Sequence, residues 1–536
     1  MSSKFKQNGS AELEHLSRQS GLSRRDFMSR AAAMGLLPAA TQLLATGAFA
    51  QTPVPGGLLR IGLDGGDTTD SLDPRAYIGT PHVSQVFSSI YDSLVLIKPG
   101  GELGPMLAES WDSNADATEW RFVLRQGVTF HDGRPFGVDD VIYSAAYLAD
   151  ELNIRAPVKS LLQAVASVEA DGDNAVVFKL NTSNYDFATM MGIQGNFIVP
   201  AGTTDFTAPV GTGPYVLESY EPGIRARLIK YDEFWTDEEG HFDEVEIINI
   251  ADASTRTSAL RNGDVDVIYR PDIATASRLS SLPGIELVLA EGGQHYTTPM
   301  RVSSSPLDNL DVRLAIKYGV RRQEFVDRVL GGFGYVGNDT PISPNYAYYN
   351  DALEAREYDP DRARFHLEKS GVSASDIPVL KTSDGAFSGA VNAAQLVQAS
   401  LSEAGIDIDI ETVPGDGYWS DVWTVAPWCF VYWNGSVTIG QQLSYYTSGN
   451  AYNDAAFNND RFDTLVANAA VERDETLRSE MYGEAQTILH DEGATLVLGF
   501  SQFIHAASSR LGHGELGGRT AVDDHSLARR WWWKEA

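Results

Sequence analysis

The chain has 536 residues with 43% hydrophobic and 21% charged side chains, a composition typical of soluble globular proteins and not of disordered ones. Its length is too great for a single core and predicts roughly three domain-sized units. The formal net charge of −31 argues against a nucleic-acid partner, because an acidic surface repels phosphate backbones.

The first 50 residues have the pattern of an export signal. An arginine pair, Arg24-Arg25, precedes an uncharged stretch over residues 31–50 that ends in the small-x-small triplet Ala48-Phe49-Ala50. This order predicts a twin-arginine signal peptide over residues 1–50, cleaved after Ala50, and hence a periplasmic protein. A membrane anchor is the alternative, but the stretch is only mildly apolar. Because the segment holds six basic and three acidic residues, its removal lowers the formal net charge to −34.

The mature chain begins with signals of a strand and a long loop. Residues 58–63 predict a strand, and the polar segment after it reaches Tyr77 and Thr80. Loops that are placed by a rigid strand often contact ligands, although solvated turns are the alternative. Tyr77 and Thr80 are therefore candidate binding residues.

Residues 104–143 carry the densest pattern of strands and turns. Trp120, Phe122 and Leu124 share one face of a predicted half-buried strand, and a helix is expected after Asp139 or Asp140 as its N-cap. Residues 165–180 predict a hairpin. His131 next to Asp132 is predicted to form a turn and not an acid-base site, because no nucleophile lies near it in sequence.

The turn Gly211-Thr212-Gly213-Pro214-Tyr215 organises the segment around it. Its glycines are expected to supply backbone angles closed to other residues, and Pro214 fixes φ before an extended run. Residues 215–217 and 226–230 then predict a hairpin. A helix over residues 253–261 is expected to stop at Asn262-Gly263, before a strand with Asp264 and Asp266 on its solvent side.

From about residue 297 the pattern becomes a second α/β region. Helices are predicted over residues 311–330, 390–404 and 474–489 and between Asp359 and Gly371, with strands over 406–411 and 495–500. Helices that alternate with strands imply a sheet covered by helices, and therefore an α/β fold. The segment Gly332-Phe333-Gly334-Tyr335-Val336-Gly337 matches the dinucleotide pattern G-x-G-x-x-G, but it follows a helix and is predicted to be a helix-ending loop.

Aromatic side chains gather over residues 418–446. Alternation of Trp428, Phe430 and Tyr432 predicts a strand whose rings belong partly to the core. Trp433 leads from this strand into Asn434-Gly435-Ser436, where an aromatic wall beside hydrogen-bonding groups would face a ligand. The single cysteine, Cys429, excludes an internal disulfide, and its aromatic neighbours predict a buried small hydrophobic residue.

These motifs together resemble the family 5 solute-binding proteins of ABC importers, the peptide/nickel type. The matching segments occur in the family's order across almost all of the mature chain: 105–111, 120–133, 139–141, 211–215, 262–266 and 311–315. The resemblance implies a bilobal periplasmic binding protein-like fold of class II, in its large three-subdomain form. The implied parts are a first lobe over 57–92, 206–298 and 496–536, an inserted subdomain over 93–205, and a second lobe over 299–495.

The resemblance further implies a monomer without a cofactor, which encloses a small solute or short peptide between its lobes and presents it to an ABC permease. The candidate ligand-binding residues are Tyr77, Thr80, Tyr296, Asp384, Phe387, Trp419, Trp433, Asn434 and Ser436. Peptide-binding relatives carry an aspartate shortly after the tryptophan that corresponds to Trp433, whereas this chain has no acid until Asp454. Either Asp384 takes that role or the ligand is a cationic, sugar-like or modified amino-acid solute.

Two alternatives from other classes remain open. A hydrolase would need a nucleophile motif, and Gly499-Phe500-Ser501-Gln502-Phe503 lacks the last glycine of the Gly-x-Ser-x-Gly elbow. A binder of a nickel or other metal complex would need ligands in the cleft. His82 and His295 are expected near it, but they lack a fixed ligand spacing, so no metal site is predicted.

Overall fold

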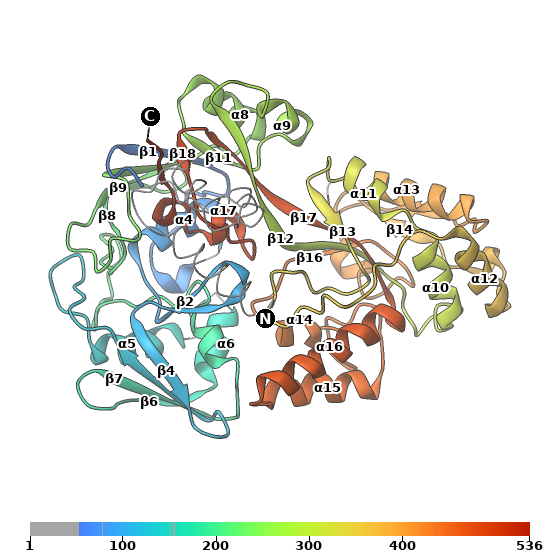
Figure 1. Ribbon diagram of the computed structural model, residues 1–536, viewed down its shortest axis with the longest axis horizontal. Coiled ribbons are helices and arrows are strands. Elements are labelled where there is room, and N and C mark those ends of the chain that lie inside the picture. The colour runs from blue at the N-terminus through green and yellow to red at the C-terminus, as the bar shows by residue number, and fades with distance from the viewer. Residues whose placement is uncertain (1–52, 78, 151, 154–155, 388, 536) are drawn as a thin grey trace, which may run out of the picture.

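The computed structural model describes residues 53–77, 79–150, 152–153, 156–387 and 389–535, so the predicted signal peptide lies outside the described residues. Figure 1 shows two bodies, one on each side, joined by the long strands β12 (Ile285–Pro299) and β17 (Thr495–Ser508). We call the body that contains the first strand lobe I and the other body lobe II. The sheet of lobe I continues into lobe II through these two strands.

The predicted strand at residues 58–63 forms the middle of the lobe I sheet. It is β1 (Leu58–Leu63), which pairs in parallel with β10 (Glu244–Asn249) and β11 (Val267–Tyr269). The predicted hairpin is also confirmed as β8 (Tyr215–Glu221) and β9 (Arg225–Lys230) at one edge. Beyond β11 the sheet order continues through β17 and β12 toward lobe II.

The glycines of the turn before β8 have a different role from the one expected. Neither Gly211 nor Gly213 has a positive φ. Instead the turn packs directly on the end of α4 (Pro81–Ile90), where a Cβ on Gly211 would lie 2.0 Å from the carbonyl oxygen of Ile90. Glycine is needed here because any side chain would collide with the helix backbone.

Two further helices belong to lobe I beside the sheet. As predicted, α8 (Ala253–Asn262) ends at Gly263, which is left-handed with φ 79°, and α9 (Ile273–Leu279) follows β11. The expectation that Asp266 faces solvent is wrong. Strand β11 lies inside the sheet with all three residues buried, and Asp266 is 8% exposed and accepts a hydrogen bond from the Arg60 amide.

A separate small unit lies between α4 and β8 in sequence and has a core of its own. We call it the inserted unit. Its strands are β4 (Ala108–Ser113), β5 (Glu119–Leu124), β6 (Val165–Ala170) and β7 (Ala175–Leu180) in the order β4-β5-β7-β6, beside the short pair β2 (Val95–Ile97) and β3 (Leu103–Pro105). Its helices are α5 (Val138–Leu148), α6 (Ala156–Gln163) and α7 (Phe187–Met191). The helix cap differs from the prediction, because Gly137 precedes α5 and Asp140 accepts its amide at 2.8 Å from inside the first turn.

Lobe II extends from the far ends of the crossing strands. Strands β13 (Gly334–Val336) and β16 (Val431–Trp433) pair with β17 and β12 there. Residues 334–336 are thus a strand, and the predicted helix-ending loop is limited to the residues before them. The helices of lobe II are α10 (Leu310–Tyr318), α11 (Arg322–Arg328), α12 (Pro360–Ser370), α13 (Ala390–Glu403), α14 (Ile439–Ser444), α15 (Asp460–Val471) and α16 (Glu475–Asp491). Lobe II also contains a parallel pair of strands, β14 (Leu380–Thr382) and β15 (Ile410–Thr412).

The single helix predicted over residues 311–330 is two helices, α10 and α11. The hydroxyl of Ser400 on α13 donates to the Gly319 carbonyl at 2.8 Å and accepts the Arg321 amide at 2.9 Å. These bonds satisfy backbone groups that a continuous helix would have paired. Contact with α13 therefore stabilises a break that the hydrophobic periodicity does not reveal.

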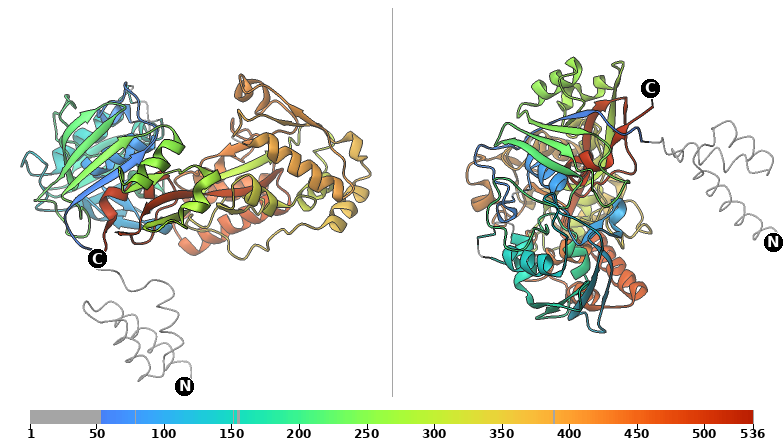
Figure 2. Two further views of the ribbon diagram at one scale, coloured as in Figure 1. Left: turned by 90° about the horizontal axis from the view of Figure 1, so that it is seen from above. Right: turned by 90° about the vertical axis from the view of Figure 1, so that its left-hand side faces the viewer.

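The chain returns to lobe I through β17, which is longer than the predicted strand 495–500. The C-terminal segment adds β18 (Leu511–Gly512), α17 (Ala521–Asp524), α18 (Leu527–Arg530) and β19 (Trp532–Trp533). Figure 2 shows this segment, in dark red, against the blue and green part of lobe I. Trp531 is 0% exposed and donates to Asp523 at 3.1 Å, so the terminal tryptophans help to build the core of lobe I.

Candidate ligand-binding cleft

Two adjoining cavities lie where the lobes and the inserted unit meet. They measure about 420 and 500 Å³, and the loop of residues 434–437 and Ile193 line both of them. We call the first the aromatic cavity, since tryptophan and tyrosine rings of lobe II form one wall of it. We call the second the arginine cavity, because Arg270 and Arg519 of lobe I line it. Shared lining makes them two parts of one cleft.

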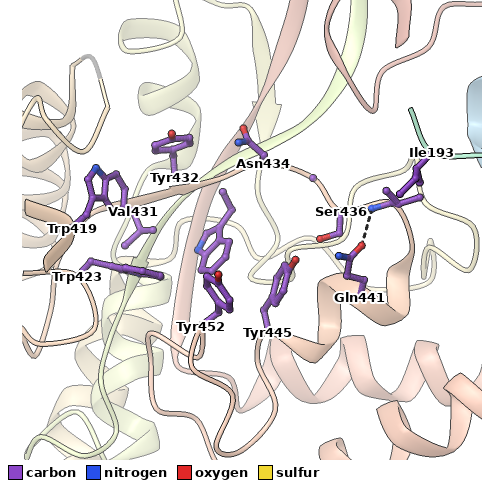
Figure 3. Close-up of a pocket in the computed structure, with 13 residues that line it drawn as sticks. Ile193, Trp419, Trp423, Val431, Tyr432, Asn434, Ser436, Gln441, Tyr445 and Tyr452 are labelled. Carbon is purple, nitrogen blue, oxygen red and sulfur yellow. Dashed lines mark hydrogen bonds between the residues drawn. The ribbon is translucent and has the colours of Figure 1, made fainter. Parts of the chain in front are cut away.

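Six rings form the wall of the aromatic cavity: Trp419, Trp423, Tyr432, Trp433, Tyr445 and Tyr452. Figure 3 shows the labelled rings along one side, with Ile193 of the inserted unit approaching from the other. Trp423 meets Trp433 at 69° and Trp419 at 74°, with centroids about 6 Å apart. Perpendicular rings leave corners in which a ligand contacts two faces at once. Trp419 and Tyr452 are 40% and 51% exposed, so both present large aromatic surface to the cleft.

An aspartate lies directly behind this wall. Asp454 is 2% exposed, and both Trp423 and Trp433 donate their indole N–H to its Oδ2 at 3.3 Å. Burial raises the pKa of this carboxyl to about 6, although the two indole hydrogen bonds act in the opposite direction. Asp454 therefore fixes the orientation of two rings and places a titratable charge next to them. Sequence reasoning noted this acid but did not place it at the site.

The loop at residues 434–437 contributes polar groups between the two cavities. Asn434 accepts a hydrogen bond from Gln294 of β12 at 3.0 Å. The Ser436 amide donates to the Tyr346 hydroxyl at 2.6 Å and to Gln442 at 3.0 Å. These bonds hold the backbone of the loop and leave the Asn434 side chain exposed at the cleft.

The arginine cavity is built largely from lobe I and the C-terminal segment. Beside its two arginines lie Thr80, Gln194, Gln294 and Asp524. Gln194 is fixed by the Tyr77 hydroxyl at 2.7 Å and by the Asp524 carbonyl at 2.8 Å. The backbone around the cavity is strained, because Arg270 has φ 49° and residues 522–525 all have φ between 51° and 58°. Such conformations cost about 1 to 3 kcal/mol each and cluster at functional sites.

The structure brings together five of the nine residues that the sequence suggested. Thr80, Asn434 and Ser436 line the arginine cavity, and Trp419 and Trp433 line the aromatic cavity together with Asn434 and Ser436. Trp423, Tyr445, Tyr452, Arg270 and Arg519 were not among the suggested residues. Trp423 and Tyr445 do lie in the aromatic stretch over residues 418–446, whereas no local motif marks Tyr452, Arg270 or Arg519.

The other four suggested residues lie outside the lining of both cavities. Tyr77 is buried behind Gln194, while Tyr296 and Phe387 pack on each other with centroids 4.8 Å apart beside the lobe II core. Asp384 is exposed, and its Oδ1 accepts the Val391 amide at 3.3 Å. Tyr77 acts on the cleft by holding Gln194, and Asp384 belongs to the turn before α13.

His82 and His295 do not form a common site. Both are 0% exposed, and burial lowers the pKa of each imidazole to about 4. His82 lies on α4, whereas His295 on β12 packs against Phe500. Within the described ranges no three His, Cys, Asp or Glu side chains group closely enough to hold a metal ion. Nor does the described part of the chain contain a helix with the length and apolarity needed to cross a bilayer.

Comparison with known proteins agrees with this architecture. The sequence model for bacterial extracellular solute-binding proteins, family 5 Middle, matches residues 102–454, which is well over half of the chain. The chain belongs to this family. The motif-based identification of a family 5 solute-binding protein is thereby confirmed, and so is the bilobal α/β fold that it implied.

Individual members of family 5 cover most of the chain. Heme-binding protein A of Haemophilus influenzae is 26% identical over 453 residues, covering 75% of this chain and 80% of that protein. The dipeptide-binding protein of Escherichia coli is 25% identical over 449 residues, covering 77% and 84%. In fold, the chain is similar to the unliganded open form of a periplasmic murein tripeptide-binding protein, with TM-score 0.80, 19% identity and coverage of 90% and 99%.

Proposed function

We propose that this family 5 protein captures a small polar organic solute, such as a short peptide or a modified amino acid, in the cleft between its lobes. It then delivers the solute unchanged to the permease of an ABC importer. The observation that carries this proposal is the aromatic wall of lobe II, which faces a cavity that lobe I and the inserted unit also line. Lobes that both contact one ligand are drawn together by it.

Three further parts of the proposal come from the sequence. A twin-arginine signal over residues 1–50 carries the chain to the periplasm, where it works as a monomer without a cofactor. It acts as a binding protein and not as an enzyme, since the matching family model describes solute-binding proteins. The relatives' names report binding of heme, dipeptides and a murein tripeptide, so the lining residues and not the fold decide the ligand.

The experiment is identification of the solute by mass spectrometry after it is released from the purified protein by denaturation. Small-angle scattering with that solute should show compaction as the lobes close. Absence of compaction with every co-purified or added solute would contradict the proposal. Chemical conversion of the solute during incubation would instead favour an enzyme.

Trp433 provides a test at the level of one side chain. Replacement by alanine removes a ring of the wall and should weaken solute binding by more than about 1 kcal/mol, because enclosed aromatic contacts contribute that much. Isothermal titration with the identified solute measures the change. Phe365→Ala is the control, since Phe365 is a 58% exposed ring of lobe II outside both cavities. Equal affinities of Trp433→Ala and the wild type would remove Trp433 from the site.

A further inference from the structure

Two arginines line the arginine cavity, and of the two it is Arg519 that has a carboxylate partner, Asp524 at 3.3 Å. Arg270 makes no ion pair within 4 Å among the described residues, and its side chain lies beside the Tyr269 ring at 5.1 Å. Asp64 is the carboxylate on the same side of lobe I, and it pairs with Arg256 at 3.6 Å.

Backbone hydrogen bonds fix the position of Arg270 at the arginine cavity. Its amide donates to the Ile504 carbonyl at 2.9 Å, and its carbonyl accepts from Arg256 at 2.8 Å. Arg256 is itself 2% exposed and bonds to Ile250, Ala251 and Tyr269 carbonyls. The buried Arg256 thus stabilises the left-handed conformation of Arg270, which would otherwise be unfavourable.

The guanidinium group of Arg519 forms only some of the hydrogen bonds that it could donate. One of its terminal nitrogens contacts the Asp524 carboxylate and the Ile97 carbonyl, both at 3.3 Å. Its Nε is buried and has no hydrogen-bond partner in the described part of the protein. The Asp524 carboxylate is shared, because its Oδ1 also accepts the amides of Arg519 and Thr520 at 2.9 and 2.7 Å. The hydroxyl of Thr80, on the same cavity, likewise lacks a partner among these residues.

We infer that Arg270 and Arg519 form an oxyanion subsite and that the solute carries a carboxylate or phosphate group, which these two side chains bind. The inference rests on the proposed function and extends it to the ligand's chemistry. Guanidinium groups match the geometry of such anions and donate paired hydrogen bonds to them. Closure of the lobes would remove water from these cations, which is costly unless an anion accompanies them.

The two cavities together define the solute more narrowly. An anionic end lies at the arginine cavity of lobe I, and an apolar or cationic part contacts the rings of lobe II. Asn434, which lines both cavities, offers a neutral carboxamide between them. A cationic part of the solute therefore meets aromatic faces instead of a direct carboxylate.

The test uses radioactive sulfate as the probe and equilibrium dialysis of the purified exported protein at low ionic strength. The wild type should bind sulfate saturably at one site, with acetate and phosphate as competitors. Arg270→Gln should weaken this binding about tenfold or more, because it removes charge-assisted hydrogen bonds. Stronger competition by acetate than by phosphate would assign a carboxylate, and the reverse order a phosphate.

Arg510→Gln is the matched control, since Arg510 is a lobe I arginine whose side chain is 74% exposed. It should bind sulfate as the wild type does. Arg519→Gln is measured as well, with its thermal unfolding midpoint as a check of folding. Arg270→Lys should recover part of the binding.

No saturable sulfate binding, or equal binding by wild type and Arg270→Gln, would overturn the subsite. So would a co-purified solute that lacks an ionised oxyanion. Solute-induced compaction that persists in such a case would leave the proposed function standing, so the two failures are distinguishable.

Discussion

Trp433 and Asp454 are 21 positions apart in the chain, yet one hydrogen bond joins them into a single unit of the site. The sequence predicts the aromatic wall, since Trp419 and Trp433 stand out by composition. It does not predict the acid behind the wall, because the irregular segment between α14 and α15 that carries Asp454 has no periodicity. The same limit explains why Arg270 and Arg519 were missed.

The wild-type protein should become less stable as the pH rises through the pKa of Asp454, and Asp454→Asn should abolish this loss. The native carboxyl has a pKa of about 6 because it is buried, against an ordinary value of 3.8. Between these values the unfolded chain has released a proton that the native protein retains, so the free energy of unfolding falls with rising pH, by about 3 kcal/mol in total. Denaturant unfolding of wild type and variant at about pH 4 and about pH 7 measures the difference.

The exposed Asp384 supplies the control for this measurement. Asp384→Asn makes the same chemical change at an exposed position of the same lobe and is measured alongside. A wild type and an Asp454→Asn variant with parallel pH profiles would show that the Asp454 carboxyl is not responsible.

The sequence predicts the ends of a helix where a capping residue determines them. Asp359 accepts the Arg362 amide at the start of α12, and Gly371 ends this helix in a left-handed conformation, as the sequence predicts. Asp474 caps α16 in the same way, although the sequence places it inside the predicted helix 474–489. The break between α10 and α11 has no such local origin. It depends on one hydroxyl of α13, which the chain reaches about 80 residues later, so only the folded structure shows it.

Ser400→Ala should therefore destabilise lobe II by about 1 to 3 kcal/mol, because the Gly319 carbonyl and the Arg321 amide both lose a buried partner. Urea unfolding measures the change in free energy. Ser402→Ala, at an exposed position of the same helix, should have a smaller effect. Equal losses from the two substitutions would mean that the break does not depend on Ser400.

At the scale of the molecule, the two lobes share one sheet. Their common strands lose register between Glu291 and His295 of β12, a stretch that contains Gly292 and Gly293. A contact outside the sheet also spans the cleft, because Asp186 of the inserted unit pairs with Arg478 of α16. The resemblance to family 5, and not the residue patterns, predicts the domain boundaries. We propose that the two lobes bend relative to each other at the register shift of β12.

Gly292→Ala tests this proposal. A Cβ there would lie 2.2 Å from the carbonyl oxygen of Ser501, so β12 and β17 must separate locally. The variant should have a lower unfolding temperature and a different radius of gyration without solute, measured by small-angle scattering. Gly514→Ala is the control, since its Cβ would meet no atom within 4 Å. Unchanged scattering together with reduced stability would place the bending elsewhere.

The shared sheet has a consequence for the integrity of the molecule. Strand β17 runs from lobe II back into lobe I and pairs along most of its length with β12, which precedes lobe II in the chain. After a proteolytic cut in a surface loop of lobe II, the backbone hydrogen bonds between β12 and β17 would still hold the two fragments together. Neither lobe can be detached intact, so damage to the loops around the cleft need not release the captured nutrient.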